Sequence, residues 1–363
     1  MRTATVVART CLCVGTLLVT ACSAGATTSG RTPGTDAGGA PPATSPGASP
    51  GLTPTHSPTH SPTLSPTLSP TLSPTTRNGT DVVVPPGGPA ALTGVPLDQT
   101  APWTPVATAS GAPVVWSASF QLPAVGAPVT VSAAVFDPTR LHAALFNGTL
   151  LPGGGPWHNG DRVPAAAVPS LVATFNGGFL FKHIHGGYFT EGTVIKPLLD
   201  GQATLAVRAD GRLVVGVYGR DLTNDGSWVS LRQNLPPMVD QGQVSIDQYP
   251  GTYWGNDLHN VWVTERSAIC TRTDGRLMYV SMGKIDVRPF ADELAAMGCR
   301  LGMELDINGG YPQFAWFSGF GTGNRSGTLL DSHMRAPDRS LTGDKKDFIA
   351  LFDPATLPAG TVV

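Results

Sequence analysis

The stretch that decides the fold is residues 289–310, PFADELAAMGCRLGMELDINGG. Its first half predicts a helix, because Pro289 can occupy a first helical position and the acidic Asp292 and Glu293 favour the positive start of a helix. Apolar residues then recur at helical spacing, and Gly298 can end the helix.

The second half of this stretch, residues 300–308, predicts a strand, because apolar and polar residues alternate. Side chains two apart on a strand point the same way, so Glu304, Asp306 and Asn308 would form one polar row. Two glycines follow, beginning with Gly309. If the row is buried, the charge of each carboxyl group shifts the pKa of the other. One group can then stay protonated and act as an acid while the other acts as a base. A half-exposed strand with its polar face in water is the other reading, and the sequence leaves both open.

Segments upstream of the helix predict further strands. Two Asp-Gly pairs, at residues 210–211 and 274–275, are strong signals for β-hairpins. The candidate strands cover residues 114–120, 129–136, 171–175, 205–217, 267–270 and 277–282. The order of strand, turn, strand, helix and strand predicts an α+β fold, a mixed β-sheet domain with few helices.

Residues 1–22 are typical of an export signal, in which Arg2 and Arg9 precede an apolar run too short to span a bilayer as a helix. The run ends in VTAC at residues 19–22, which looks like a bacterial lipobox, so Cys22 is the predicted lipidation site. An ordinary secretory signal with an incidental cysteine is the alternative. The lipoprotein reading predicts an extracytoplasmic protein, lipid-anchored to the outer face of the bacterial cytoplasmic membrane.

Residues 23–93 are predicted to be a disordered linker rich in proline, serine and threonine. Within them, residues 54–76 repeat a four-residue unit, Pro-Thr-His-Ser and then Pro-Thr-Leu-Ser. A proline at every fourth position prevents regular helix and sheet hydrogen bonding and favours polyproline II. The linker would then act as a tether, and residues 94–363 would form the folded domain.

The charge balance excludes two kinds of partner surface. The chain has 23 Lys and Arg against 25 Asp and Glu, a formal net charge of −2. It therefore lacks the basic surface that nucleic acid normally requires, and no nucleic-acid partner is expected. A polybasic membrane patch is excluded for the same reason.

Two cysteines remain in the predicted domain, Cys270 and Cys299. In an oxidising compartment, a disulfide between them would close a loop of about 30 residues and stabilise the fold by a few kcal/mol. Two separate buried thiols are equally compatible with the sequence.

A second candidate element is the sequence Asn-Gly-Gly at residues 176–178, which ends a predicted strand. Glycines permit positive φ and a close approach of backbone N–H groups to an anion, although turns use glycine pairs constantly. Arg266 opens a later strand and offers a planar fork for phosphate or carboxylate, or else a surface salt bridge. His183 and His185 could share a divalent metal, but spacing places no third ligand, so the metal stays unknown and no cofactor is certain.

Taken together, these segments resemble the phosphodiester glycosidase family over residues 102–351. Each motif is soft, but their order and spacing are specific. In chain order the motifs are Asn176-Gly177-Gly178-Phe179, Arg266-Ser267-Ala268-Ile269, Thr273-Asp274-Gly275-Arg276-Leu277, Asp292-Glu293-Leu294-Ala295, Gly298-Cys299 and Glu304-Leu305-Asp306.

The resemblance implies hydrolysis of a sugar that is joined through its anomeric oxygen to a phosphodiester. It implies that Asn176, Gly177, Gly178 and Arg266 bind the substrate, together with Asn308 and Gly309, and that Asp306 lies at the catalytic position. Asp306 is the first choice for the base or nucleophile and Glu304 the second. The family ending Asn-Leu-Asp-Gly-Gly-Gly-Ser differs here, because Ile307 follows the aspartate and the serine is absent.

Two functions from different classes are expected. The first is an envelope-tethered hydrolase that acts on a phosphate-linked glycan. The second is a glycan-binding lipoprotein that keeps the pocket without turnover. In both, the partners would be a phosphate-linked glycan and, through the lipid anchor, a membrane.

Overall fold

The computed structural model describes residues 103–363, except 124–126, 256–261 and 320–325. The predicted leader 1–22, its Cys22 and the predicted linker 23–93 lie outside the described residues.

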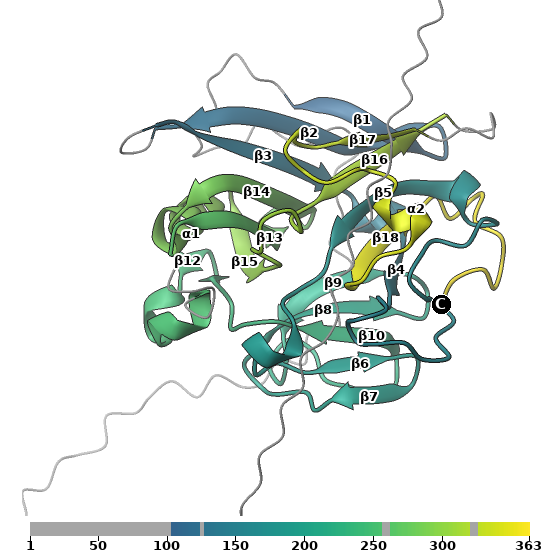
Figure 1. Ribbon diagram of the computed structural model, residues 1–363, viewed down its shortest axis with the longest axis horizontal. Coiled ribbons are helices and arrows are strands. Elements are labelled where there is room, and N and C mark those ends of the chain that lie inside the picture. Colours follow the sequence, from purple (N-terminus) through teal and green to yellow (C-terminus); the bar gives the residue numbers. More distant parts are fainter. Residues whose placement is uncertain (1–102, 124–126, 256–261, 320–325) are drawn as a thin grey trace, which may run out of the picture. The chain divides into compact units, whose positions relative to one another are not determined.

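The domain is built from three β-sheets, and every pairing between named strands in the described part is antiparallel (Figure 1). The eight-stranded sheet runs in the order β1 (Thr104–Ala109), β2 (Ala112–Leu122), β3 (Val129–Phe136), β14 (Leu277–Ile285), β13 (Thr264–Arg272), β15 (Cys299–Glu304), β11 (Val239–Asp240) and β12 (Gln243–Val244). One five-stranded sheet runs β7 (Thr193–Lys196), β6 (Tyr188–Thr190), β10 (Trp228–Gln233), β8 (Ala203–Arg208) and β9 (Leu213–Val217). The other runs β17 (Ser326–Leu329), β16 (Phe314–Ser318), β5 (Leu171–Asn176), β18 (Phe348–Phe352) and β4 (His142–Phe146).

Helices are few in the described part. The α-helices are α1 (Val287–Ala296) and α2 (Arg339–Thr342), and the short 3₁₀ turns are Pro138–Arg140, Val168–Ser170, Phe181–His183, Ile246–Gln248 and Gly251–Trp254. A β-sheet domain with few helices is therefore confirmed as the fold class. Among the described residues, no helix is both long enough and apolar enough to cross a membrane.

The two predicted hairpins are present, since β8 pairs with β9 around Asp210-Gly211 and β13 pairs with β14 around Asp274-Gly275. The helix, however, begins before Pro289: Asp286 precedes Val287 and its side chain accepts a hydrogen bond from the backbone of Arg288. The prediction of a strand over 300–308 was wrong at its end, because β15 stops at Glu304 and the residues beyond it form a loop.

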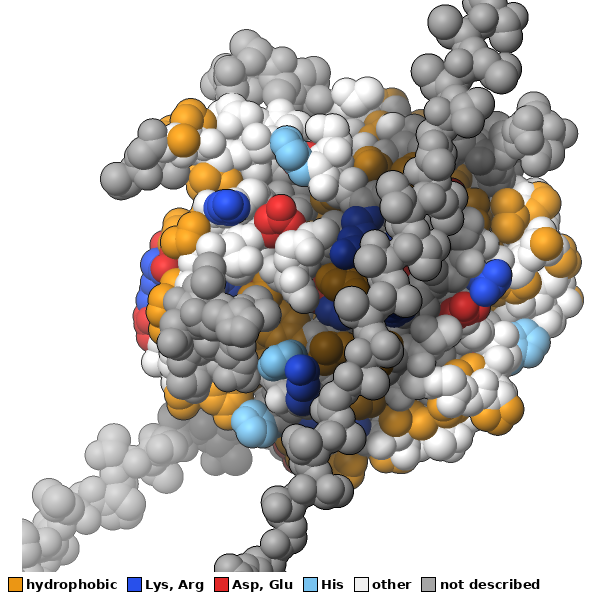
Figure 2. Space-filling view, viewed as in Figure 1, with side chains coloured by type: hydrophobic (Ala, Val, Ile, Leu, Met, Phe, Trp, Pro, Cys, Tyr) orange, Lys and Arg blue, Asp and Glu red, His pale blue; other side chains and the backbone are white. Residues whose placement is uncertain are grey.

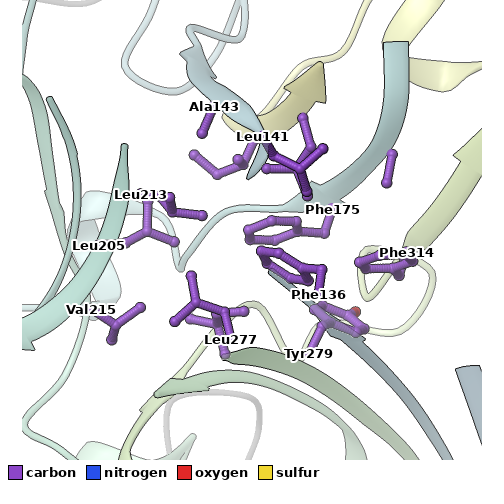
Figure 3. Packing of buried hydrophobic residues seen from close by; sticks show 14 of the residues in the cluster. Phe136, Leu141, Ala143, Phe175, Leu205, Leu213, Val215, Leu277, Tyr279 and Phe314 are labelled. Carbon is purple, nitrogen blue, oxygen red and sulfur yellow. The ribbon is translucent and has the colours of Figure 1, made fainter. Parts of the chain in front are cut away.

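The largest hydrophobic cluster lies where the three sheets face one another (Figure 3). Phe136 of β3, Phe175 of β5, Leu205 of β8 and Phe314 of β16 all belong to it and are almost fully buried. Tyr279 of β14 packs against the Phe314 ring, with ring centroids 5.4 Å apart. This packing fixes the ends of β5 and β13–β15 against each other, and those ends carry the predicted site.

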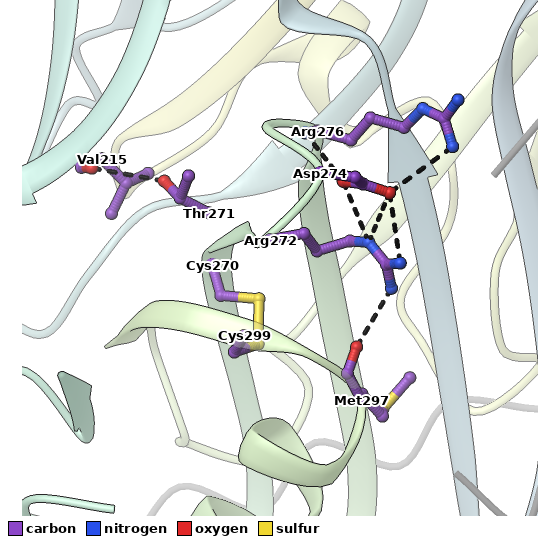
Figure 4. The surroundings of a disulfide bond; sticks show 8 residues. All are labelled: Val215, Cys270, Thr271, Arg272, Asp274, Arg276, Met297 and Cys299. Carbon is purple, nitrogen blue, oxygen red and sulfur yellow. Dashed lines mark hydrogen bonds and ion pairs between the residues drawn. A yellow bond between two sulfur atoms is a disulfide. The ribbon is translucent and has the colours of Figure 1, made fainter. Parts of the chain in front are cut away.

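Cys270 and Cys299 form a disulfide with an S–S distance of 2.05 Å, so the bonded alternative of the sequence analysis is the one present (Figure 4). The bond joins β13 to its neighbour β15. Beside it, the Arg272 guanidinium donates to the Met297 carbonyl at 3.0 Å, which ties β13 to the end of α1.

Candidate functional site

The residues that the sequence predicts as a site come together at one end of three strands. Glu304 is the last residue of β15, Asn176 is the last residue of β5, and Arg266 lies on β13. The Asp306 N–H donates to the Gly177 carbonyl at 3.0 Å, which joins the loop after β15 to the loop after β5. The predicted carboxyl groups and the predicted glycine loop therefore share one place in the fold.

Arg266 and Glu304 form an ion pair in which both side chains are 0% exposed, with Nη1 of Arg266 2.6 Å from Oε1 of Glu304. Burial raises the pKa of Glu304, and the nearby charge of Asp306 adds to this rise, while Arg266 opposes it. The other oxygen of Glu304, Oε2, is buried and has no hydrogen-bond partner among the described residues. Glu304 thus keeps one unused acceptor inside the site.

The guanidinium of Arg266 is saturated by the protein itself. Besides Glu304, its nitrogens donate to the backbone carbonyls of Ile285, Trp254 and Trp262 at 2.9–3.3 Å. These contacts occupy all three guanidinium nitrogens. The geometry therefore makes Arg266 a positioning residue for Glu304, and a direct phosphate contact of Arg266 stays a prediction.

Asp306 has its own cation. Its Oδ2 contacts Nζ of Lys346, and its Oδ1 accepts a hydrogen bond from the Asn308 N–H at 3.0 Å. The two charged side chains are only 5% and 7% exposed. Burial raises the pKa of Asp306, Lys346 opposes the rise, and the charge of Asp347 adds to it. The site therefore contains two buried carboxyl groups with raised pKa values, each held by a different cation.

Lys346 reaches the site because of long-range strand pairing. β18 runs antiparallel to β5 with Phe348 opposite Asn176, so the residues just before β18 lie beside the glycine loop just after β5. The Asp347 carbonyl accepts from the Gly177 N–H at 2.9 Å. Neither Lys346 nor Asp347 is marked by a sequence motif, since only the register of β18 on β5 brings them there.

A third buried ion pair lies next to this loop. Nε of Arg232 is 2.7 Å from Oδ2 of Asp347, with exposures of 1% and 0%. The same guanidinium donates to the Phe179 carbonyl at 2.7 Å. Arg232, on β10, therefore links the residue before β18 to the end of the glycine loop. No sequence motif pointed to Arg232.

The two glycines after Asn176 are required by close packing. A Cβ at Gly177 would collide with the carboxylate of Asp347, and a Cβ at Gly178 would lie 2.7 Å from Oδ1 of Asn234. No hydrogen bond engages the Gly178 N–H among the described residues, whereas the Phe179 N–H donates to Asn234 at 2.9 Å. The glycines thus allow the charged and amide side chains to approach the backbone.

The side-chain amide of Asn176 makes all its hydrogen bonds to other groups of the protein. Its Oδ1 accepts from the Tyr279 hydroxyl at 2.8 Å and from the Gln313 N–H at 2.9 Å, and its Nδ2 donates to the Ser267 hydroxyl at 3.1 Å and to the Gly177 carbonyl. Ser267 in turn donates to the Asp306 carbonyl at 2.7 Å. Asn176 therefore orients the loop that carries Asp306, and its predicted contact with substrate stays a prediction.

The loop after Asp306 accommodates Ile307 at the position where the family pattern has glycine. Ile307 has no positive φ and is 1% exposed, packed in a hydrophobic cluster, so this position does not need the conformations of glycine. Asn308 and Gly309 are exposed, which leaves them accessible to a ligand. Gly310 has a φ of +82°, a conformation that side chains rarely adopt.

The predicted metal pair does not gain a third ligand. Among the residues that the structure covers, no group of three His, Cys, Asp or Glu side chains is arranged to hold a metal ion. His185 is exposed and lies against Tyr253, with ring centroids 5.6 Å apart, and His183 belongs to a 3₁₀ turn. The structure therefore gives no positive support for a metal at these residues.

The architecture is a β-sheet domain in which the loops after β5 and β15 bring two buried carboxyl groups, Glu304 and Asp306, to one place. Residues 169–313 match the family model described as phosphodiester glycosidase. The predicted family resemblance is therefore confirmed for this segment, which contains the glycine loop, Arg232, Arg266, Glu304 and Asp306. Lys346 and Asp347 lie beyond the matched segment.

Several solved structures are similar to this chain. The catalytic domain of zebrafish N-acetylglucosamine-1-phosphodiester α-N-acetylglucosaminidase, auto-inhibited by its pro-peptide, is 17% identical, with 69% of this chain and 87% of that chain covered and a TM-score of 0.45. A hypothetical protein from Synechocystis is 9% identical, with 66% and 62% covered and a TM-score of 0.37. A putative exported protein from Burkholderia pseudomallei is 12% identical, with 62% and 74% covered and a TM-score of 0.35. No curated protein sequence matches the chain significantly.

Proposed function

We propose that this protein hydrolyses a glycosyl phosphodiester, a sugar linked through its anomeric oxygen to a phosphodiester, and releases free sugar and a phosphate monoester. The observation that carries the proposal is the pair of buried, electrostatically coupled carboxyl groups, Glu304 and Asp306, each held by its own cation. Raised pKa values allow one carboxyl group to hold a proton while the other accepts one.

The proposed step is attack of water on the anomeric carbon. The bond between that carbon and the bridging oxygen breaks, its electron pair stays on the phosphate oxygen, and Asp306 accepts the proton that water loses. A phosphate monoester is already a good leaving group, so little acid assistance is needed. Glu304, with its unused Oε2, would supply the second carboxyl group.

We propose in addition that the domain is tethered to the cell envelope through a lipid on Cys22 and the linker 23–93. The disulfide in the described domain supports this location, because such bonds persist in oxidising, extracytoplasmic compartments. Replacing Cys22 with Ala should release the protein from membranes into the soluble fraction, and mass spectrometry of the N-terminal peptide should detect the acyl chains. A peptide without acyl chains would contradict the anchor.

The second candidate function is glycan binding without turnover. It is favoured by one observation, that Lys346 and Arg266 already neutralise the two carboxyl groups. Saturable binding of a glycosyl phosphodiester without any release of phosphate monoester would support this function against the first.

The test is a release assay with defined glycosyl phosphodiesters, carried out with and without a chelator. We expect phosphate monoester and reducing sugar in equal amounts, and water labelled with ¹⁸O should place the label on the sugar. Asp306→Asn should lower the rate by about a hundredfold or more, as expected for the loss of a proton acceptor. Asp247→Asn is the control, because Asp247 is an exposed partner of Arg288. Unchanged turnover in Asp306→Asn would remove Asp306 from the mechanism.

A further inference from the structure

Three cationic side chains converge on one aromatic ring beside the carboxyl groups. Nζ of Lys346 lies 3.7 Å from the centroid of the Tyr311 ring, and the Cζ atoms of Arg335 and Arg339 lie 4.6 Å and 5.8 Å from it. In the space-filling view, Lys and Arg side chains gather near the centre of the face, between the sheet with β13 and β15 and the sheet with β5 and β18 (Figure 2). Like charges repel at such distances, so this cluster requires compensation.

The protein supplies only part of that compensation. Nε of Arg339 lies 2.5 Å from Oδ2 of Asp344, and Lys346 contacts Asp306. Arg335 is exposed and has no carboxylate within ion-pair distance among the described residues. The cluster therefore carries more positive than negative charge.

One donor in the cluster is also left without a partner. The Arg339 side chain is 11% exposed, and its Nη1 is buried. This nitrogen makes no hydrogen bond to any described residue. A buried donor without an acceptor is costly, and a ligand oxygen would relieve that cost. Arginine forks bind phosphate oxygens with two parallel hydrogen bonds, which makes a phosphate group a suitable ligand.

The guanidinium of Arg335 lies close to Gly310, whose positive φ already favours glycine. A Cβ at Gly310 would lie 2.9 Å from Nε of Arg335, so a side chain there would displace the guanidinium from the Tyr311 ring. The Tyr311 N–H donates to the Asn308 carbonyl at 2.8 Å, which holds the ring on the turn that follows Asp306. The same short loop thus presents the ring to the cations and places Asp306 beside them.

We propose that Arg335, Arg339 and Lys346, arranged around Tyr311, bind the phosphate group of the substrate. This assignment rests on the proposed function and replaces the contact first expected of Arg266, whose donors are already used. The phosphate would then lie next to Asp306, because Lys346 touches both the Tyr311 ring and the Asp306 carboxylate. Arg335 is the specificity residue of the three, since no carboxylate of the described residues neutralises its guanidinium.

The binding test uses inorganic phosphate as the probe and the full chain with its disulfide intact. Arg335→Gln should weaken phosphate binding, measured by titration calorimetry, by about tenfold or more, as expected for the loss of a charge-assisted hydrogen bond. Arg208→Gln is the matched control, because Arg208 also lies over an aromatic ring, 5.7 Å from Trp228, far along the chain in β8. Arg208→Gln should leave phosphate binding unchanged.

A kinetic test uses a glycosyl phosphodiester and an uncharged aryl glycoside of the same sugar. Arg335→Gln should raise KM for the phosphodiester at least as strongly as it weakens phosphate binding, and leave KM for the aryl glycoside unchanged. Equal losses on both substrates would overturn the assignment, because they would indicate a general structural defect.

The two proposals fail separately. If the wild-type chain hydrolyses the phosphodiester but Arg335→Gln binds phosphate as tightly as wild type, the phosphate assignment is wrong and the hydrolase proposal stands. If the wild-type chain binds phosphate through Arg335 but releases nothing from any phosphodiester, the hydrolase proposal fails and the anion site stands. If wild type does not bind phosphate at all, the assignment is overturned directly.

Discussion

Replacing Arg266 with Met tests the claim that this residue positions Glu304. The change removes one member of a buried ion pair, which typically costs about 3–5 kcal/mol because the remaining charge is left uncompensated. It also removes the hydrogen bonds that Arg266 donates to the carbonyls of Ile285, Trp254 and Trp262, at about 1–3 kcal/mol for each carbonyl left buried without another donor. Since domains of this kind are stable by about 5–15 kcal/mol, we expect a loss of at least about 4 kcal/mol in the free energy of unfolding.

The charge contribution can be separated from the carbonyl contribution with a double-mutant cycle. Glu304→Leu alone should also destabilise by about 3–5 kcal/mol, because it leaves the Arg266 charge unpaired. The double variant removes both charges, so its loss should be smaller than the sum of the two single losses by about 2 kcal/mol or more. Arg266→Lys keeps a positive charge and serves as a milder variant if Arg266→Met does not fold.

The assay is urea unfolding at pH 7, followed by tryptophan fluorescence with the disulfide intact. Arg220→Met is the control, because its partners Asp221 and Asp240 are partly exposed and the loss should be below about 1 kcal/mol. A loss below about 1 kcal/mol for Arg266→Met, or strictly additive effects in the cycle, would refute the reasoning.

Three further predictions concern stability. Burial raises the pKa of Glu293, whose Oε1 has no hydrogen-bond partner among the described residues. The folded state therefore binds this proton more tightly, and the free energy of unfolding falls as pH rises above the unfolded pKa of 4.5. Glu293→Gln should remove that fall between pH 4 and pH 8 in urea titrations, and an unchanged slope would contradict it. Gly177→Ala should cost about 1–3 kcal/mol through its collision with Asp347, whereas the exposed Gly154→Ala should cost little, and equal melting temperatures would count against the packing argument. Replacing both Cys270 and Cys299 with Ala should lower the free energy of unfolding by about 2–5 kcal/mol, and an unchanged urea midpoint would show that the bond contributes nothing.

Elements set by local patterns could be predicted from the sequence. The strand predicted at 129–136 coincides with β3, and both Asp-Gly turns connect paired strands. These features depend on residues close together in the chain, namely alternation and turn chemistry. The predicted start of α1 at Pro289 was late by two residues, because the Asp286 side chain caps the helix and Pro289 fits its first turn as the third residue.

The site could be predicted only in part. The family motifs pointed to Glu304 and Asp306, and the structure brings them to the glycine loop as expected. Lys346 gave no local signal, because it reaches the site through the pairing of β18 with β5, across about 170 residues of chain. Arg335 gave none either, because its backbone is held by Gln313, whose Nε2 donates to the Arg335 carbonyl at 2.9 Å. The saturation of Arg266 was equally hidden, since three backbone carbonyls from separate segments accept its protons.

The covalent bond between β13 and β15 has a practical consequence for work on this protein. Those two neighbouring strands carry Arg266 and Glu304, so the cross-link lies in the same strand pair as the buried charge pair of the site. Material produced in a reducing cytosol would lack this cross-link. Activity should therefore be measured on protein prepared in an oxidising compartment. Free-thiol titration of each batch shows whether an inactive sample lacks the disulfide or is inactive with the disulfide intact.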